Sequence, residues 1–162
     1  MDGFSLLDWK KSEAGILAVT VIVIFGLSFF QIKLGEIKTR DAQRKADAEM
    51  IGRGIRKFRD DYKVVPEMAT AEGKIKSCGN EGGLVCEWGK GRLTDEEGVI
   101  YVNLIPGDPL TSKGRTYVYW ASPDRQTFRI YAGLENGGDK DIKRDLTVMC
   151  GDNVQCNWYV QE

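Results

Sequence analysis

The sequence contains no histidine among its 162 residues. This absence excludes Ser-His and Cys-His nucleophile pairs, and it excludes zinc sites that use histidine. The chain also lacks an excess of charge of either sign, because 23 lysines and arginines are balanced by 24 aspartates and glutamates. A nucleic-acid-binding surface normally brings a clear basic excess, so we expect no nucleic-acid partner. The length fits a single domain of ordinary size.

Charge is also missing from one long segment near the N-terminus. Residues 14–32 form an uncharged run of 19 residues, most of them Val, Ile, Leu, Phe or Ala. A helix of this length spans about 28 Å, close to the hydrocarbon thickness of a bilayer. A cleaved signal peptide is the alternative, but its apolar region is usually shorter and ends at a small-residue cleavage site. We therefore predict a retained transmembrane helix at residues 14–34, after a short cytoplasmic N-terminus at residues 1–13.

Two signals disagree about the orientation of this helix. Only Lys10 and Lys11 precede the apolar run, whereas more basic residues follow it closely, at Lys33, Lys38, Arg40, Arg44 and Lys45. The positive-inside rule therefore favours a cytoplasmic C-terminal domain. The cysteines favour the opposite side, because all four lie beyond the run and close local pairs suit an oxidising compartment. We follow the cysteines and predict a single-pass protein of the cytoplasmic membrane with an extracytoplasmic C-terminal domain.

The four cysteines form two pairs that are close in sequence. Short separation and neighbouring glycines favour the disulfides Cys78–Cys86 and Cys150–Cys156 over the other two connectivities. A four-cysteine zinc site is the alternative. The spacings C-x7-C and C-x5-C are wider than the C-x2-4-C spacing typical of zinc knuckles, so we favour disulfides.

Residues 35–65 are predicted to extend the membrane helix as an amphipathic helix that ends before Pro66. Steps of three and four residues place one apolar stripe on it, at Ala48, Ile51, Ile55, Phe58 and Tyr62. Most basic residues fall off this stripe, and we interpret them as a solvated face in preference to a lipid-binding or partner-binding patch: Arg44, Lys45, Arg53, Arg56, Lys57 and Arg59. Gly52 and Gly54 each weaken a helix by about 1 kcal/mol relative to alanine, so packing must compensate for them.

Residues 66–162 are predicted to form a globular domain with a small antiparallel sheet and two cysteine loops. Its expected elements are a glycine-rich loop at 68–92, a short helix at 94–104, a hairpin of strands at 116–121 and 127–132, and a last strand pair at 146–149 and 157–160. The short helix is favoured over a strand because Thr94 and Glu97 have capping-box spacing. The predicted fold class is α+β, with one long N-terminal helix packed on a small antiparallel sheet.

The order of these features resembles that of type IV pilins and of the major pseudopilins of type II secretion systems. Residues 40–47, the apolar stripe, and Asp61-Tyr62 before Pro66 are similar to the helix that follows the membrane segment in pilin-like proteins. Residues 101–109 resemble the Leu-Pro-x-Asp-Pro turn of the major pseudopilin, and residues 116–136 continue the pattern. The resemblance covers nearly the whole chain and implies a pilin-like fold.

The resemblance also implies a role for an acidic residue near the N-terminus. In pilin-like proteins a peptidase cuts after a glycine, and a glutamate five residues later meets the new amine of the next subunit. In the register that we favour, Glu13 takes this place directly before the apolar run, and the peptidase motif is lost. In the alternative register Gly3 and Phe4 flank the cleavage site and Asp8 is the acid. The leader at residues 1–3 contains no basic residue, so a subunit that is not cleaved is an alternative.

Major pseudopilins hold calcium in a loop after the hairpin, so the resemblance suggests calcium as a cofactor here. The matching residues are 134–142, where Asn136, Asp139 and Asp141 are the candidate ligands. Lys140 and Lys143 already neutralise part of the charge. A solvated acidic turn is the favoured interpretation of this loop, with calcium as the alternative.

The resemblance implies a structural subunit of a type IV pilus or a type II secretion filament. Its partners would be other copies or other pilin-like subunits, the inner-membrane assembly platform and the lipid bilayer, and it would reach the periplasm or cell surface once assembled. One alternative is an uncleaved, membrane-anchored binding module that holds a ligand through the 78–86 loop and the aromatic hairpin. An enzyme would need carboxylates such as Asp108, Glu135, Asp139 and Asp141 for acid–base chemistry. Acids in glycine-rich loops are mostly solvated, so we expect no enzymatic activity.

Overall fold

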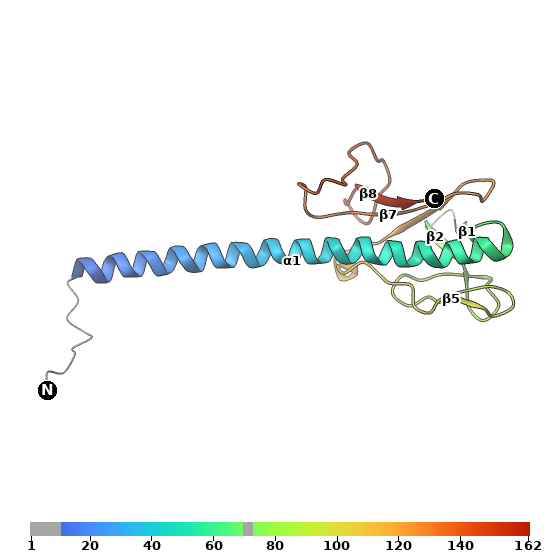
Figure 1. Cartoon of the computed structure of the whole chain (residues 1–162), viewed down its shortest axis with the longest axis horizontal. Coiled ribbons are helices and arrows are strands. Elements are labelled where there is room, and N and C mark those ends of the chain that lie inside the picture. The colour runs from blue at the N-terminus through green and yellow to red at the C-terminus, as the bar shows by residue number, and fades with distance from the viewer. Residues whose placement is uncertain (1–10, 70–72) are drawn as a thin grey trace, which may run out of the picture. The chain divides into compact units, whose positions relative to one another are not determined.

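The computed structural model describes residues 11–69 and 73–162, with side chains from residue 14 onward (Figure 1). Within these ranges it is an α+β protein with one long helix followed by short strands, whose bounds are α1 (Lys11–Tyr62), β1 (Glu67–Ala69), β2 (Lys74–Cys78), β3 (Leu84–Val85), β4 (Leu93–Thr94), β5 (Ile100–Val102), the 3-10 helix η1 (Thr111–Lys113), β6 (Val118–Ala121), β7 (Phe128–Ala132) and β8 (Trp158–Gln161). The chain divides into two compact units, residues 1–38 and 39–162.

The first unit is the N-terminal part of α1, and its described side chains are exposed to solvent over residues 14–36. The large apolar side chains in this run are 37–72% exposed. The helix is long and apolar enough to cross a membrane. The sequence therefore predicted correctly that this segment is helical and apolar, while the side of a membrane on which each end lies stays a prediction.

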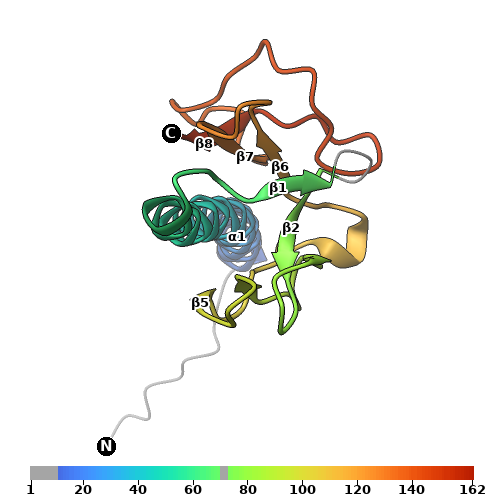
Figure 2. The same ribbon diagram turned by 90° about the vertical axis from the view of Figure 1, so that its right-hand side faces the viewer.

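The second unit packs residues 39–62 of α1 against two small antiparallel sheets. Figure 2 shows β6, β7 and β8 on one side of this helix and β5 on the other. The predicted apolar stripe faces the core: Ala48, Ile51 and Ile55 are fully buried and Phe58 is 7% exposed. Tyr62, the last residue of the helix, is 39% exposed. The stripe therefore extends one turn less far than its spacing predicts.

The first sheet corrects two predictions. Its strand order is β1-β2-β4-β5, with β3 also paired to β2, where the sequence predicted a loop at 68–92 and a short helix at 94–104. The glycine content of the first segment suggested a loop, yet Ile75 and Ser77 are buried while Lys76 between them is exposed, the alternation of a strand.

The supposed capping box at Thr94 belongs to a β-turn instead. One carboxylate oxygen of Asp95 accepts hydrogen bonds from the backbone amides of Glu97 and Val99, at 2.9 and 2.8 Å. Gly98 has φ of 81°, which an L side chain rarely adopts, and it lets the chain reverse between β4 and β5. The β-branched and aromatic residues that follow therefore form a strand, as their propensity favours.

The second sheet has the order β6-β7-β8 and confirms the predicted hairpin. The C-terminal strand is also present, but its partner is β7 and not the segment at 146–149. That segment forms only an isolated bridge between Met149 and Gln155. The segment pairs within the second disulfide loop instead, where the amide of Cys156 donates to the carbonyl oxygen of Val148 at 2.8 Å and Cys150 is bridged to Cys156. The other disulfide, Cys78–Cys86, joins the end of β2 to the residue after β3.

Gly54 marks the closest approach of the helix to the first sheet. A Cβ atom at this position would lie 2.2 Å from a methyl group of Val102 and 3.2 Å from the carbonyl oxygen of Tyr101. At Gly52 a Cβ atom would find its nearest neighbours at 3.6 Å, an ordinary contact distance. Gly54 therefore lowers the helix propensity of α1, but its lack of a side chain is what lets β5 pack closely on the helix.

We expect Gly54→Ala and Gly52→Ala to change stability in opposite directions. The first should lower the free energy of unfolding by about 1–3 kcal/mol through overpacking. The second should raise it by up to about 1 kcal/mol because alanine is the better helix former. Urea unfolding of the full chain in detergent micelles, followed by tryptophan fluorescence, measures both. Equal destabilisation by the two substitutions would contradict the packing explanation.

Candidate functional site

The most deeply buried charge in the described residues is the guanidinium of Arg44, whose exposed fraction is 0%. Its Nε and Nη2 atoms donate to the two carboxylate oxygens of Asp108, at 2.7 and 3.1 Å. Its Nη1 atom donates to Asp41 at 2.8 Å and to Glu135 at 2.7 Å. The prediction that Arg44 belongs to a solvated face is therefore wrong, because three carboxylates compensate for the burial of its charge.

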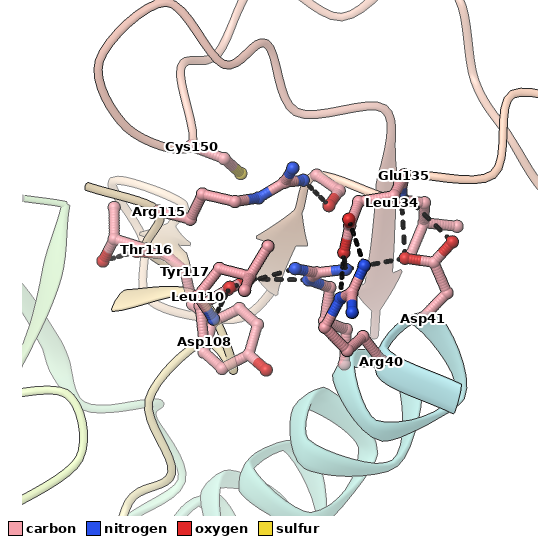
Figure 3. Close-up of polar contacts among 12 residues, drawn as sticks. Arg40, Asp41, Asp108, Leu110, Arg115, Thr116, Tyr117, Leu134, Glu135 and Cys150 are labelled. Atoms are coloured by element: carbon pink, nitrogen blue, oxygen red, sulfur yellow. Dashed lines mark hydrogen bonds and ion pairs between the residues drawn. The ribbon is translucent and has the colours of Figure 1, made fainter. Parts of the chain in front are cut away.

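A second arginine and a set of backbone amides complete this cluster, which we call the Arg44 clamp and define as Arg40, Asp41, Arg44, Asp108 and Glu135. Arg40 donates two hydrogen bonds to the two oxygens of Glu135, at 2.8 and 2.7 Å. The carboxylate of Asp41 accepts from the backbone amides of Glu135 and Asn136. Figure 3 shows how these side chains converge from the helix and from two separate loops. The clamp fastens α1 to residues 105–109 and to the loop after β7.

The pKa values in the clamp favour its charged state. Burial alone lowers the pKa of Arg44, but the hydrogen bonds to Asp108 and Glu135 outweigh it and raise that pKa above its ordinary value. Hydrogen bonds from Arg40, joined by those from Arg44, lower the pKa of Glu135 to about 2 against the opposing effect of burial. The nearby Arg115 donates to the carbonyl oxygen of Gly133, and burial followed by repulsion from Arg44 lowers its pKa.

The helix positions explain how the chain builds the clamp. Arg40 and Arg44 are one helical turn apart and therefore lie on the same face of α1. The side chain of Asp108 is held by its turn, where it also accepts a hydrogen bond from the amide of Leu110 at 2.8 Å. Sequence reasoning considered Asp108 and Glu135 only as candidate acid–base carboxylates. The spacing of Arg40 and Arg44 places both on one helix face, but no local pattern shows that this face is buried.

The predicted calcium loop has a cation from the chain itself. The ammonium of Lys45 lies 2.9 Å from both oxygens of Asp139 and 2.8 Å from one oxygen of Asp141. The side-chain oxygen of Asn136 instead accepts from the amide of Gly138, at 3.2 Å. Across residues 14–69 and 73–162, the acids and cysteines form no group of three or more suited to a metal. Calcium at this loop stays a prediction, and it would compete with Lys45 for the two aspartates.

The other basic residues of the helix divide into two sets. Arg56 and Arg59 donate to the carboxylate of Glu162, at 3.0 and 2.7 Å, and so bind the C-terminal strand to the helix. Arg53 and Lys57 are exposed, as the sequence predicted. The solvated face is therefore narrower than expected.

Most of the N-terminal candidate residues cannot be placed in the structure. Gly3, Phe4 and Asp8 lie outside the described residues, and so does the side chain of Glu13, whose backbone is in α1. The apolar surface that follows Glu13 is described, and none of it is buried by the protein. No protein-family model, curated protein or solved structure matches the chain. Its function is therefore inferred from its own residues and geometry.

We expect Arg44→Met to destabilise the protein strongly. The substitution keeps the apolar stem but leaves Asp108 and Asp41 buried without their cation, which should cost about 3–5 kcal/mol. Arg56→Met is the matched control, since its ion pair with Glu162 is partly exposed and should cost about 1 kcal/mol or less. Urea unfolding of both variants measures the difference. Similar losses would show that the clamp is no more important than a surface ion pair.

The clamp also predicts a pH dependence of stability. The folded pKa of Glu135 is about 2, below its ordinary value of 4.5, so its contribution is complete above pH 4.5 and is lost as the pH falls toward 2. Glu135→Gln should therefore flatten the fall in melting temperature across this range. Glu96→Gln, which changes an exposed carboxylate, should leave the fall unchanged. An identical profile for the wild type and Glu135→Gln would refute this assignment.

Proposed function

We propose that the chain is a structural, pilin-like subunit that assembles through its N-terminal helix into a filament of the type IV pilus or type II secretion class. The observation that carries the proposal is the uncovered apolar surface of α1 over residues 14–32. A continuous apolar surface of this size is unstable in water and requires either lipid or other protein. In the proposed role lipid covers it in the stored subunit, and the helices of other copies replace the lipid in the filament.

The disulfides support an extracytoplasmic location for the second unit. All four cysteines are paired, in two local bridges. Such bridges persist in oxidising compartments and are rare in the cytosol. In the proposed topology the N-terminus is cytoplasmic and the sheets lie beyond the membrane, where they can contact neighbouring subunits.

Glu13 supplies register in this proposal. A lone carboxylate beside a membrane span is unfavourable when it lacks a partner. Helices that slide past one another would leave this acid unpaired in every register except the one that brings a cation to it. The acid therefore selects one subunit offset among many with similar apolar contacts.

A second candidate function is supported by a groove beside the first disulfide. This open groove has a volume of about 780 Å³, and Cys78, Leu84, Ile100 and Leu104 are among its lining residues. A membrane-anchored binding module could hold a ligand there without polymerising. Shearing of native cells separates the two functions, because a filament subunit is released in polymers and an anchored module stays in the membrane.

The experiment that tests the proposed function is the substitution Glu13→Gln in the full chain, expressed in its native cells. Membrane insertion should be unchanged, and the yield of sheared filaments should fall by about tenfold, the effect of about 1.4 kcal/mol in register selection. Glu36→Gln is the matched control at the other end of the apolar run. Mass spectrometry of the released subunit shows in the same experiment whether its N-terminus has been cut.

An unchanged filament yield would exclude Glu13 as the register residue, and Asp8→Asn would then test the alternative register. The absence of the wild-type chain from any sheared polymer would reject the filament function itself.

A further inference from the structure

The outward face of the second sheet carries two cations held against aromatic rings. Along β7 the buried residues Phe128 and Ile130 face the main core, so Arg129 between them lies on the other face. The segment of the second disulfide partly covers that face, where Tyr131 is buried and Trp120 and Tyr159 are half-buried. The guanidinium of Arg129 lies 5.5 Å from the ring centroid of Trp120 on β6 and 5.0 Å from that of Tyr159 on β8. The ammonium of Lys143 lies 4.6 Å from the Tyr159 ring. We call these four residues the cation–aromatic face.

These cations are positioned but not neutralised. Arg129 donates to the side-chain oxygen of Gln161 at 3.2 Å and contacts the Tyr131 hydroxyl at 3.5 Å. Within residues 14–69 and 73–162, neither Arg129 nor Lys143 forms an ion pair with a carboxylate, unlike Arg40, Arg44, Lys45 and Arg56. A guanidinium stacked between two rings loses little freedom when it binds a carboxylate. The cation–aromatic face therefore presents preorganised positive charge to which an anionic group can bind.

The complementary surface lies at the turn between β4 and β5. Glu96 and Glu97 are exposed there, and in the described part of the chain neither carboxylate forms an ion pair. The adjacent side chains are apolar and also exposed, Val99 by 47% and Ile100 by 50%. Among the strands that the structure describes, β5 is the last in its sheet order, so one of its edges has no neighbour there. We call Glu96, Glu97, Val99 and Ile100 the acidic turn.

We propose that the cation–aromatic face of one copy binds the acidic turn of a second copy. Charge complementarity supports this occupant, since two unpaired cations would meet two unpaired carboxylates. The apolar part matches as well, because Trp120 and Tyr159 can cover Val99 and Ile100, which are otherwise exposed to water. This inference rests on the proposed function, which brings many copies together in one membrane.

The positions of the two surfaces decide what kind of assembly they can form. They belong to different sheets, and β5, which follows the acidic turn, lies on the opposite side of residues 39–62 of α1 from β6, β7 and β8 in Figure 2. After one such contact the first copy still has a free acidic turn, and the second still has a free cation–aromatic face. Such a head-to-tail contact repeats without limit or closes into a ring, whereas a two-fold contact stops at a dimer.

Zero-length carbodiimide cross-linking of the full chain in native membranes tests this contact. The reagent joins an amine to a carboxylate only where the two groups touch. Two differently tagged copies are expressed together, so that mass spectrometry recognises bonds between copies. We expect isopeptide bonds from Lys143 of one copy to Glu96 or Glu97 of the other.

Arg129→Gln keeps the reactive amine of Lys143 but removes the second cation, so the yield of this bond should fall by about fivefold or more. Lys113→Gln, which removes an exposed charge elsewhere, should leave the yield unchanged. The exchange of Lys143→Glu together with Glu97→Lys in one chain should restore a bond, now from Lys at position 97 to Glu at position 143. Raising the salt concentration to about 0.5 M should lower the yield of the isopeptide bonds in every variant.

The absence of these bonds between copies overturns the inference, and so does a yield that Arg129→Gln leaves unchanged. Filaments that form without the bonds would leave the proposed function intact and reject the contact. The bonds without filaments would support the contact between copies and reject the filament function.

Discussion

The buried guanidinium of Arg44 is the constraint on which the rest of the second unit depends. It is fully enclosed and binds carboxylates from the helix, from the turn at 105–109 and from the loop after β7. Apolar packing alone would tolerate small slips of the helix along the sheets. A buried charge with three specific partners does not, because each slip leaves an ion without compensation. The helix therefore has one position relative to the two loops.

The clamp and the packing at Gly54 act at different points along the helix. The clamp fixes the turns around residues 40–44, and the close contact with Val102 fixes the turn around Gly54. Between them, Ala48 and Ile51 are fully buried. Two separate contacts along residues 39–62 of α1 fix both the position of this segment along the sheets and its direction. The two surfaces that we propose for assembly are thereby held in a constant relation to residues 39–62 of the helix.

Hydrophobic periodicity predicted the elements of this chain that have a strong local pattern. The apolar run, the stripe at 48–58 and the hairpin of β6 and β7 all have strong local patterns, and each is present in the structure. The errors fall at β2, whose neighbouring residues are rich in glycine, and at β5, where the spacing of Thr94 and Glu97 suggested a capping box. The two disulfides follow from short separation in the sequence.

The clamp could not be predicted in the same way. Asp108 and Glu135 lie 64 and 91 residues after Arg44 in the sequence. A solvated arginine has the same local sequence as a buried one. Only the fold brings Asp108 and Glu135 to Arg44. The contacts of Lys45 with the acidic loop escape local reasoning for the same reason, since they span 94 and 96 residues.

If the chain has the proposed orientation, the contrast between contacts that are near and distant in sequence sets the order in which they would form during export. Each disulfide closes a loop of only a few residues, with separations of 8 and 6, so it can form as soon as its own segment has emerged from the membrane. Arg44 emerges first in the proposed orientation and must wait for Asp108 and then for Glu135. In that orientation Glu162 follows all of these groups across the membrane, so its ion pairs with Arg56 and Arg59 would form after the other contacts of the helix.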